Sequence, residues 1–283
     1  MGGGRLTTGS FPGARGRRIS WRDYELEGAP ARGVVVIAHG FGEHSGRYEH
    51  VAERLQREEY AVYALDHHGH GKSEGTRGRI SFADAVSDLD RLFDLAAERH
   101  PDQPVFLLGH SMGGALALRY ALAHGERLTG LILSGPLVQV EGRTAARLMG
   151  RFLGVVAPNL PVARLDPNLV SRDPAVVRAY VEDPLVFHKP LPAGTVSEFL
   201  RHAATLPGDV PGITVPTLLM YGTADGLCDP RGAVLVSERI GASDLTTIPY
   251  EGLYHEILNE PERERVVDDL AAWLAVRTPA VSR

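Results

Sequence analysis

The chain of 283 residues is 43% hydrophobic and 23% charged, the usual balance of a soluble globular protein and enough for a sizeable core. Its formal net charge of −5 argues against nucleic acid as a main partner, and its single cysteine, Cys228, excludes an intrachain disulfide. The N-terminus lacks the apolar run of a signal peptide, and no stretch is long enough for an apolar membrane span. We therefore expect a cytoplasmic protein.

Short apolar runs and amphipathic helical segments alternate along most of the chain. The expected strands cover residues 19–26, 34–38, 60–65, 104–108, 131–133, 216–221 and 245–248. The expected helices cover residues 47–57 and 80–99, a run after residue 111, and a C-terminal stretch that begins at Pro261. Strands joined by helices of this length form a parallel sheet with right-handed crossovers. The sequence thus predicts an α/β fold, with a mostly parallel central sheet flanked by helices.

Two segments depart from this alternation. Residues 1–18 are rich in glycine and arginine, and we expect a flexible N-terminal segment there. Residues 136–207 carry many prolines and no clear strand, which predicts a mainly helical cap inserted between core residues 19–135 and 208–283. Ligands bind at the carboxyl ends of the strands in such sheets, so we expect the cap to act as a lid. A surface insertion without function is the alternative.

The most informative motif is Gly-His-Ser-Met-Gly at residues 109–113, a G-x-S-x-G pattern between a buried strand and a helix. A serine on such a sharp turn presents its hydroxyl to a substrate, and the glycines allow the close backbone approach that the turn needs. The following helix directs its positive end at the site. We therefore expect Ser111 to be a nucleophile rather than a simple helix cap.

A serine hydroxyl needs a base, and that base needs a carboxylate to orient it. In the hydrolase order of serine, acid and histidine, the acid and the histidine follow late strands. Asp225 follows the strand at 216–221, and His255 lies in the loop after the next strand. Asp229 is the rival acid, but Asp225 lies closer to its strand end. We therefore expect Ser111, Asp225 and His255 to form a catalytic triad.

The tetrahedral intermediate of ester hydrolysis requires backbone N–H donors for its oxyanion. The residue after the nucleophile, Met112, is one expected donor. The other comes from the loop after the strand at 34–38, where glycines flank Phe41 and let the backbone approach the substrate. The sequence thus predicts an oxyanion hole made by Phe41 and Met112.

At these positions the chain resembles the monoacylglycerol lipases, of bacterial type, within the α/β-hydrolase superfamily. The matching segments are HGFGEHSGRY at 39–48, DHHGHGKSEG at 66–75, GHSMGG at 109–114, YGTADGLCD at 221–229 and YEGLYHE at 250–256. The resemblance spans roughly residues 20–275. It implies an α/β-hydrolase core with a cap, no metal or cofactor, and hydrolysis of monoacylglycerol to fatty acid and glycerol.

The resemblance also implies substrate-binding residues. Glu43 and Arg47 match positions that hold the glycerol head in mammalian members, where a histidine at the position of Leu258 assists them. An ion pair at a helix start is an equally good interpretation of Glu43 and Arg47. Cys228 matches a cysteine beside the alcohol pocket, although a buried and inert thiol is equally compatible. His110, next to the nucleophile, is also expected to contact substrate.

Three histidines at 67, 68 and 70 could suggest a metal site. No carboxylate or cysteine set with metal-like spacing accompanies them, and Asp66, Gly69, Gly71 and Ser73 favour a tight turn beside the oxyanion loop. We therefore expect no metal. Three other functions use the same residues: a lysophospholipase or general carboxylesterase, an acyltransferase, and a ligand-binding protein of the same fold without turnover.

The cap sequence contains an amphipathic pattern. Arg143, Arg147 and Arg151 recur every four residues and share one helix face. The apolar residues on another face are Ala145, Leu148, Met149, Phe152, Leu153 and Val156. Such a helix either packs its apolar face on its own protein or binds a lipid surface, with arginines on anionic head groups. A lipid substrate and a peripheral membrane contact are therefore the expected partners, and the oligomeric state is left open.

Overall fold

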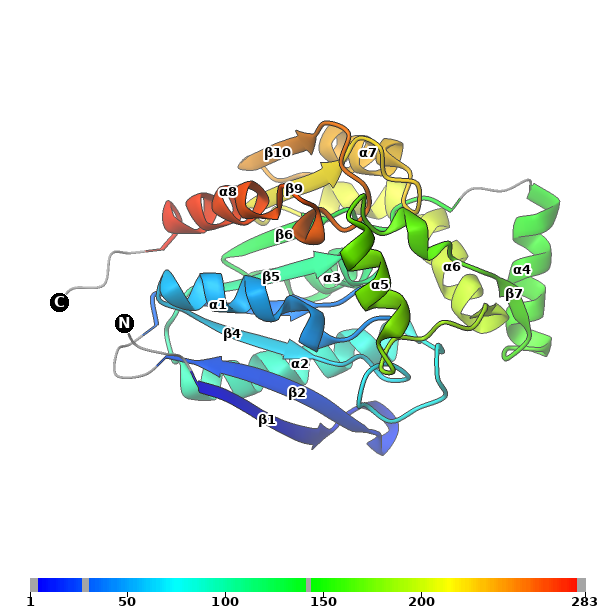
Figure 1. The fold of residues 1–283 in the computed structure, drawn as a ribbon, viewed down its shortest axis with the longest axis horizontal. Coiled ribbons are helices and arrows are strands. Elements are labelled where there is room, and N and C mark those ends of the chain that lie inside the picture. Colours follow the sequence, from blue (N-terminus) through cyan, green and yellow to red (C-terminus); the bar gives the residue numbers. More distant parts are fainter. Residues whose placement is uncertain (1–4, 27–30, 141–143, 279–283) are drawn as a thin grey trace.

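The computed structural model describes residues 5–26, 31–140 and 144–278 and contains an eight-stranded sheet covered by helices on both faces (Figure 1). The strands lie in the order β1-β2-β4-β3-β5-β6-β9-β10, antiparallel at β1–β2 and β2–β4 and parallel elsewhere. Their bounds are β1 (Arg5–Pro12), β2 (Arg18–Glu25), β3 (Gly33–Ala38), β4 (Tyr60–Leu65), β5 (Val105–His110), β6 (Gly130–Ser134), β9 (Thr217–Gly222) and β10 (Leu245–Tyr250). The predicted α/β fold, with a mostly parallel central sheet flanked by helices, is confirmed.

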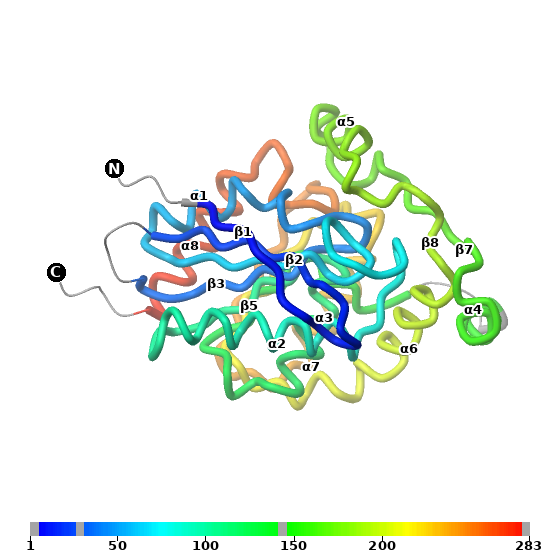
Figure 2. Tube along the Cα trace, turned by 90° about the horizontal axis from the view of Figure 1, so that it is seen from below, coloured from blue at the N-terminus to red at the C-terminus, as the bar shows by residue number. Residues whose placement is uncertain are grey.

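Helices cover the sheet as two layers, which Figure 2 shows from below. On one face α2 (Phe82–Arg99), α3 (Met112–His124) and α7 (Pro230–Arg239) pack, and on the other α1 (Glu49–Arg57) and α8 (Arg263–Ala275). Every residue of β3, β4 and β6 is buried, as expected where both faces of a parallel sheet are covered. The apolar runs in the sequence follow from this burial.

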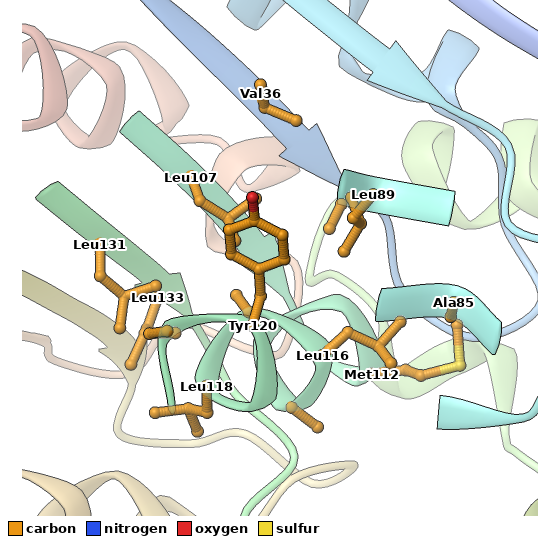
Figure 3. Close-up of a cluster of buried hydrophobic side chains, with 14 of the residues drawn as sticks. Val36, Ala85, Leu89, Leu107, Met112, Leu116, Leu118, Tyr120, Leu131 and Leu133 are labelled. Atoms are coloured by element: carbon orange, nitrogen blue, oxygen red, sulfur yellow. The ribbon is translucent and has the colours of Figure 1, made fainter. Parts of the chain in front are cut away.

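The helix that begins next to Ser111 is held by a cluster of buried hydrophobic side chains (Figure 3). Met112 and Leu116 of α3 point toward Ala85 and Leu89 of α2, and Tyr120 lies against the strands. The Tyr120 ring also stacks on Phe93, with 4.6 Å between ring centroids. This packing fixes the position of the α3 N-terminus, and with it the strand-to-helix turn.

The N-terminal segment differs from the expectation of a flexible stretch at residues 1–18. Arg5–Pro12 forms β1, whose eight residues pair antiparallel with β2 from Arg5–Glu25 to Pro12–Arg18. A tight turn between the strands is stabilised by the Ala14 N–H, which donates to the buried Asp88 carboxylate at 2.6 Å. Pairing with the following strand β2, rather than local apolar periodicity, makes this segment regular. Residues 1–4 lie outside the described part.

The segment between β6 and β9 carries the predicted cap, beyond the carboxyl ends of the parallel strands (Figure 1). Its elements are α4 (Thr144–Val156), β7 (Pro161–Ala163), α5 (Pro174–Glu182), β8 (Leu191–Pro192) and α6 (Ala193–Asp209). The expectation that it holds no strand is wrong for β7 and β8, which form a two-stranded ribbon too short for a periodic signal. The boundaries 136 and 207 stay a prediction.

Candidate active site

Ser111 lies on the turn between β5 and α3 in a backbone conformation rare for a residue with a side chain, at φ 55° and ψ −117°. The turn requires glycine on both sides. A Cβ on Gly109 would lie 2.3 Å from the Gly113 carbonyl oxygen, and one on Gly113 would lie 2.0 Å from that of Ala38. The strained conformation presents the hydroxyl at the positive end of α3.

The acid and the base come from the loops after β9 and β10. The Nδ1 of His255 lies 2.7 Å from Oδ2 of Asp225. The other carboxylate oxygen of Asp225 accepts the backbone N–H groups of Leu227 (2.8 Å) and Cys228 (2.9 Å). The rival acid, Asp229, instead caps α7 through the Arg231 N–H at 2.9 Å. Asp225 is therefore the carboxylate that orients His255.

The electrostatics of His255 suit a base that gains a charge during reaction. Burial lowers the pKa of His255, but the charge of Asp225 and its hydrogen bond outweigh burial, so the pKa lies above its ordinary value. The ring of His110 lies against that of His255, with 4.7 Å between centroids. Burial and the neighbouring His255 lower the pKa of His110 to about 4, so His110 is neutral at pH 7. His110 thus packs against the ring of the expected base, His255, and also lines the cavity described below.

The expected oxyanion donors face the same cavity. Phe41 and Met112 both line it, and within the described chain neither backbone N–H has a hydrogen-bond partner in the protein. The side chain of Phe41 packs edge-on against the rings of Phe187 and Phe199 of the cap, at 5.9 and 6.0 Å. Two unpaired N–H groups beside a serine are what a developing oxyanion requires.

Glu43 and Arg47 form the ion pair that the sequence left open, at 2.9 Å from Nη1 to Oε2. The other oxygen of Glu43 accepts the Gly40 N–H at 2.6 Å and the Tyr48 hydroxyl at 2.7 Å. Burial raises the pKa of Glu43, but the positive charges of Arg47 and, less strongly, of His110 outweigh burial. The pKa of Glu43 is therefore lowered to about 2. Glu43 lines the cavity, whereas Arg47 is not among its lining residues.

Cys228 lies at the nucleophile, with its Sγ 3.8 Å from the Oγ of Ser111. Burial, then the charge of Asp225, raises the pKa of the Cys228 thiol well above its ordinary value. The thiol is therefore protonated at neutral pH and contributes volume and a weak hydrogen bond rather than a reactive thiolate. Cys228 also lines the cavity beside Ser111.

The histidine-rich segment forms the predicted tight turn. Asp66 accepts the Ser45 N–H at 2.8 Å and the Lys72 N–H at 2.8 Å, and Gly69 and Gly71 have positive φ. Among the described residues, no group of three or more histidine, cysteine or acidic side chains could hold a metal ion. Hydrogen bonds from the Ser45 N–H to Asp66 and from the His67 N–H to His39 join this turn to the oxyanion loop.

These groups surround one cavity of about 520 Å³, within the range of small-molecule sites. Ser111, Asp225 and His255 line it together. Most of its remaining lining is apolar. The cap and the loop after β6 contribute Leu137, Val140, Leu165, Leu191, Val196 and Phe199. A polar reacting centre at one side of an apolar cavity fits an ester with a long acyl chain.

Sequence reasoning assigned no role to two residues that the structure brings to the site. Glu256 follows His255 and makes two hydrogen bonds with Arg47, at 2.6 and 2.8 Å. Tyr180 of α5 lies over the same guanidinium, with 4.9 Å between its ring centroid and Cζ. A charged residue directly after the expected base was a signal for Glu256, but nothing in the cap sequence marked Tyr180.

Comparison with known proteins agrees with this geometry. The family model described as "Serine aminopeptidase, S33" matches residues 29–262. A monoacylglycerol lipase of Mycolicibacterium smegmatis is 40% identical over 94% of this chain and 95% of its own length. A monoglyceride lipase of Homo sapiens is 37% identical over 94% and 89%.

Solved structures give the same result. A monoacylglycerol lipase of Paleococcus ferrophilus superposes with a TM-score of 0.82 at 31% identity, covering 97% of this chain and 100% of its own. Identity and fold agree over nearly the whole length, including the segment of the cap. The chain therefore belongs to the monoacylglycerol lipase family of the α/β hydrolases.

Proposed function

We propose that this protein hydrolyses the ester bond of monoacylglycerols, releasing a fatty acid and glycerol through an acyl-enzyme on Ser111. The observation that carries the proposal is the convergence of Ser111, the Asp225–His255 pair and two unpartnered N–H groups on one apolar cavity. The names of the relatives in the family support a monoacylglycerol as the substrate. The apolar part of the cavity receives the acyl chain.

Acylation begins when the Oγ of Ser111 attacks the acyl carbon and the Nε2 of His255 takes the hydroxyl proton. Asp225 holds the histidine in the tautomer whose Nε2 is free to accept, and stabilises the imidazolium that forms. The N–H groups of Phe41 and Met112 bind the oxyanion, an effect of about 3–4 kcal/mol per donor in other enzymes. The imidazolium then protonates the leaving glycerol oxygen.

Deacylation repeats these steps with water. His255 removes a proton from water, the hydroxide attacks the acyl carbon, and the fatty acid leaves as the proton returns to Ser111. Glu43, Cys228 and His110 line the cavity beside the reacting atoms and form part of the alcohol side of the site in this proposal. No metal or cofactor takes part in any of these steps.

A substrate panel tests the proposal directly. At fixed enzyme concentration, we expect a higher kcat/KM for monoacylglycerols than for di- and triacylglycerols, lysophospholipids and short aryl esters. A fluorophosphonate probe is expected to label Ser111, and Ser111→Ala is expected to remove both labelling and turnover. A higher kcat/KM for lysophospholipids would show that the proposed substrate is wrong. Absence of labelling in the wild type would favour a ligand-binding protein.

We also propose that the cap contacts membranes through α4. The apolar residues of this helix are exposed, at 62% for Leu148, 60% for Phe152 and 78% for Val155. The opposite side packs on α6 through small residues, because a Cβ on Gly154 would lie 2.3 Å from Ser197 and one on Gly150 would lie 3.0 Å from Leu200.

This arrangement reverses an ordinary surface helix, whose apolar face packs inward. It supports the lipid-surface interpretation of the cap, with Arg147 and Arg151 close to anionic head groups. Arg143 lies outside the described residues. No helix in the described part is long and apolar enough to cross a membrane. In our proposal the protein is therefore a cytoplasmic enzyme that binds membranes peripherally.

Flotation with vesicles of neutral and anionic phospholipid tests the contact. We expect the wild type to float with anionic vesicles and the Leu148→Ser/Phe152→Ser double variant to stay at the bottom. Val276→Ser removes a side chain that is 80% exposed at the end of α8 and serves as the matched control. Equal flotation of wild type and double variant, or none by the wild type, would leave α4 as a lid that selects substrate by shape.

A further inference from the structure

Arg47 bridges two loops of the active site. Its Nη1 donates to Oε2 of Glu43 at 2.9 Å and to Oε1 of Glu256 at 2.6 Å, and its Nη2 donates to Oε2 of Glu256 at 2.8 Å. All three side chains are nearly buried, at 11% exposed for Arg47, 4% for Glu43 and 5% for Glu256. This is one cation shared by two carboxylates from segments far apart in the chain.

Each carboxylate is joined to a reacting group. The Oε1 of Glu43 accepts the N–H of Gly40, the residue before the expected oxyanion donor Phe41. Glu256 follows His255 directly, and the Glu256 N–H donates to the carbonyl of Val170 in the cap at 2.8 Å. Through its two carboxylate partners, Arg47 therefore links the segment of the expected oxyanion donor to the segment of the expected base.

The cap closes over this bridge. Tyr180 of α5 covers the guanidinium of Arg47, and His44 of the oxyanion loop lies 2.8 Å from Oδ2 of Asp183. The Phe187 N–H donates to the carbonyl of Gly42 at 2.7 Å. These contacts belong to the part of the cap around α5, which rests on the core, and not to α4, which stands away from it (Figure 1).

An alcohol ligand at Arg47 is a poor fit to this arrangement. Three of the five guanidinium N–H groups donate to carboxylates and an aromatic ring covers one face, and Arg47 does not line the cavity, whereas Glu43 and Glu256 do. Displacing either carboxylate would leave a buried charge unpaired, which is strongly unfavourable. The contacts of Arg47 therefore favour a role in holding Glu43 and Glu256 in place.

We propose that Arg47 is a positioning residue that joins the oxyanion loop to the loop of His255 through Glu43 and Glu256, and that it does not bind the leaving alcohol. This rests on the proposed function of the site. The planar guanidinium contacts both carboxylates at once, with a two-bond fork toward Glu256, and a lysine ammonium cannot reproduce that fork.

The test compares two esters of the same fatty acid, monoacylglycerol and the p-nitrophenyl ester, because the aryl ester has no glycerol. We expect Arg47→Lys and Glu256→Gln each to lower kcat on both esters by a similar factor of about 10 to 100, the loss typical of a misplaced reacting group, with KM changed less than about threefold. We expect the double variant to lose little more than either single one, since both break the same bridge. A rise in KM for monoacylglycerol alone would overturn the proposal and make Arg47 an alcohol ligand.

The control variant is Arg54→Lys on α1, because Arg54 also joins two carboxylates, Glu58 at 3.0 Å and Asp268 at 2.9 Å, but none of these three residues lines the cavity. It is expected to retain wild-type kcat on both esters. Rates are taken per titrated active site, so that misfolded protein does not enter kcat.

The pH dependence of kcat/KM is a second measurement, which a general loss of rigidity would not change. The groups that raise the pKa of His255 are Asp225, Glu256 and Glu43, with neutral His110 against its ring. Glu256→Gln removes one negative charge, so the acid limb of kcat/KM is expected at lower pH than in the wild type. An unmoved acid limb together with unchanged kcat on the aryl ester would refute the bridge. If the wild type cleaves only the aryl ester, the proposed substrate fails, while the bridge is still tested on that ester.

Discussion

Replacing Asp225 with asparagine tests how the base is oriented. In the wild type one oxygen of Asp225 faces Nδ1 of His255 at 2.7 Å, and the other accepts the N–H groups of Leu227 and Cys228. In Asp225→Asn the amide oxygen stays with these two N–H donors, so the amide NH₂ turns toward Nδ1. The histidine must then accept at Nδ1 and carry its proton on Nε2, where it cannot take the proton of Ser111.

The magnitude follows from the cost of turning the amide around. The productive orientation would leave two buried N–H donors unpaired, at about 1–3 kcal/mol each, or about 2–6 kcal/mol together. At about 1.4 kcal/mol per factor of ten, this reduces the productive population roughly 30-fold to 20,000-fold. The same replacement in a serine protease triad costs about 10⁴ in kcat. We expect a fall near the middle of this range, about 10³.

The assay is kcat for the preferred ester across the pH range, normalised to folded protein by thermal unfolding. High pH is not expected to rescue Asp225→Asn, because the defect is the tautomer rather than the charge. The comparison variant is Asp229→Asn, which alters the N-cap residue of helix α7. We expect it to lose far less activity. A kcat for Asp225→Asn above about a tenth of wild type would refute the argument, as would a larger loss in Asp229→Asn.

Three further predictions concern the turn and the base. Ser111→Ala is expected to lose turnover with its fold intact. Ser111→Gly is expected to be more stable than Ser111→Ala by about 1 kcal/mol and to unfold at a higher temperature, because glycine accepts φ 55° without strain. Equal melting temperatures of the two variants would contradict the assigned strain. The acid limb of kcat/KM is expected above pH 6.5, because activity needs neutral His255 and its pKa is raised above 6.5; a limb below pH 6 would contradict the assigned charges. Gly113→Ala places a Cβ 2.0 Å from the Ala38 carbonyl oxygen and is expected to lower the free energy of unfolding by at least about 3 kcal/mol. In Gly208→Ala the new Cβ in α6 meets nothing within 4 Å, so we expect an unchanged or higher free energy of unfolding in chemical denaturation. Similar denaturation midpoints for these two variants would refute the packing argument.

The membrane contact depends on a structural choice that periodicity alone left open. A helix with apolar and basic faces in its sequence can turn either face toward its own protein. Gly154 favours the observed orientation of α4, because a Cβ there would lie 2.3 Å from Ser197 of α6, and Gly150 also faces α6 without a side chain. The apolar face is consequently left outside.

The sequence by itself predicted most strands of the main sheet, though not β1, and the three residues of the expected triad. These features are local: an apolar run long enough for one strand, a turn that only glycines permit, and a polar residue directly after a strand end. Parallel strands bring such ends to one edge, so Ser111, Asp225 and His255 could be placed together without coordinates. The shorter distance from the strand end then favoured Asp225 over Asp229.

Only the tertiary structure decided the pairing of β1, the orientation of α4 and the contacts of Arg47. β1 is stabilised by a partner strand and Arg47 by a carboxylate from the far end of the chain, and neither leaves a periodic pattern in its own segment. Tyr180 reaches the same guanidinium from the cap through an aperiodic, proline-rich segment. Interactions between residues distant in sequence depend on how elements meet in space, which local apolar spacing does not encode.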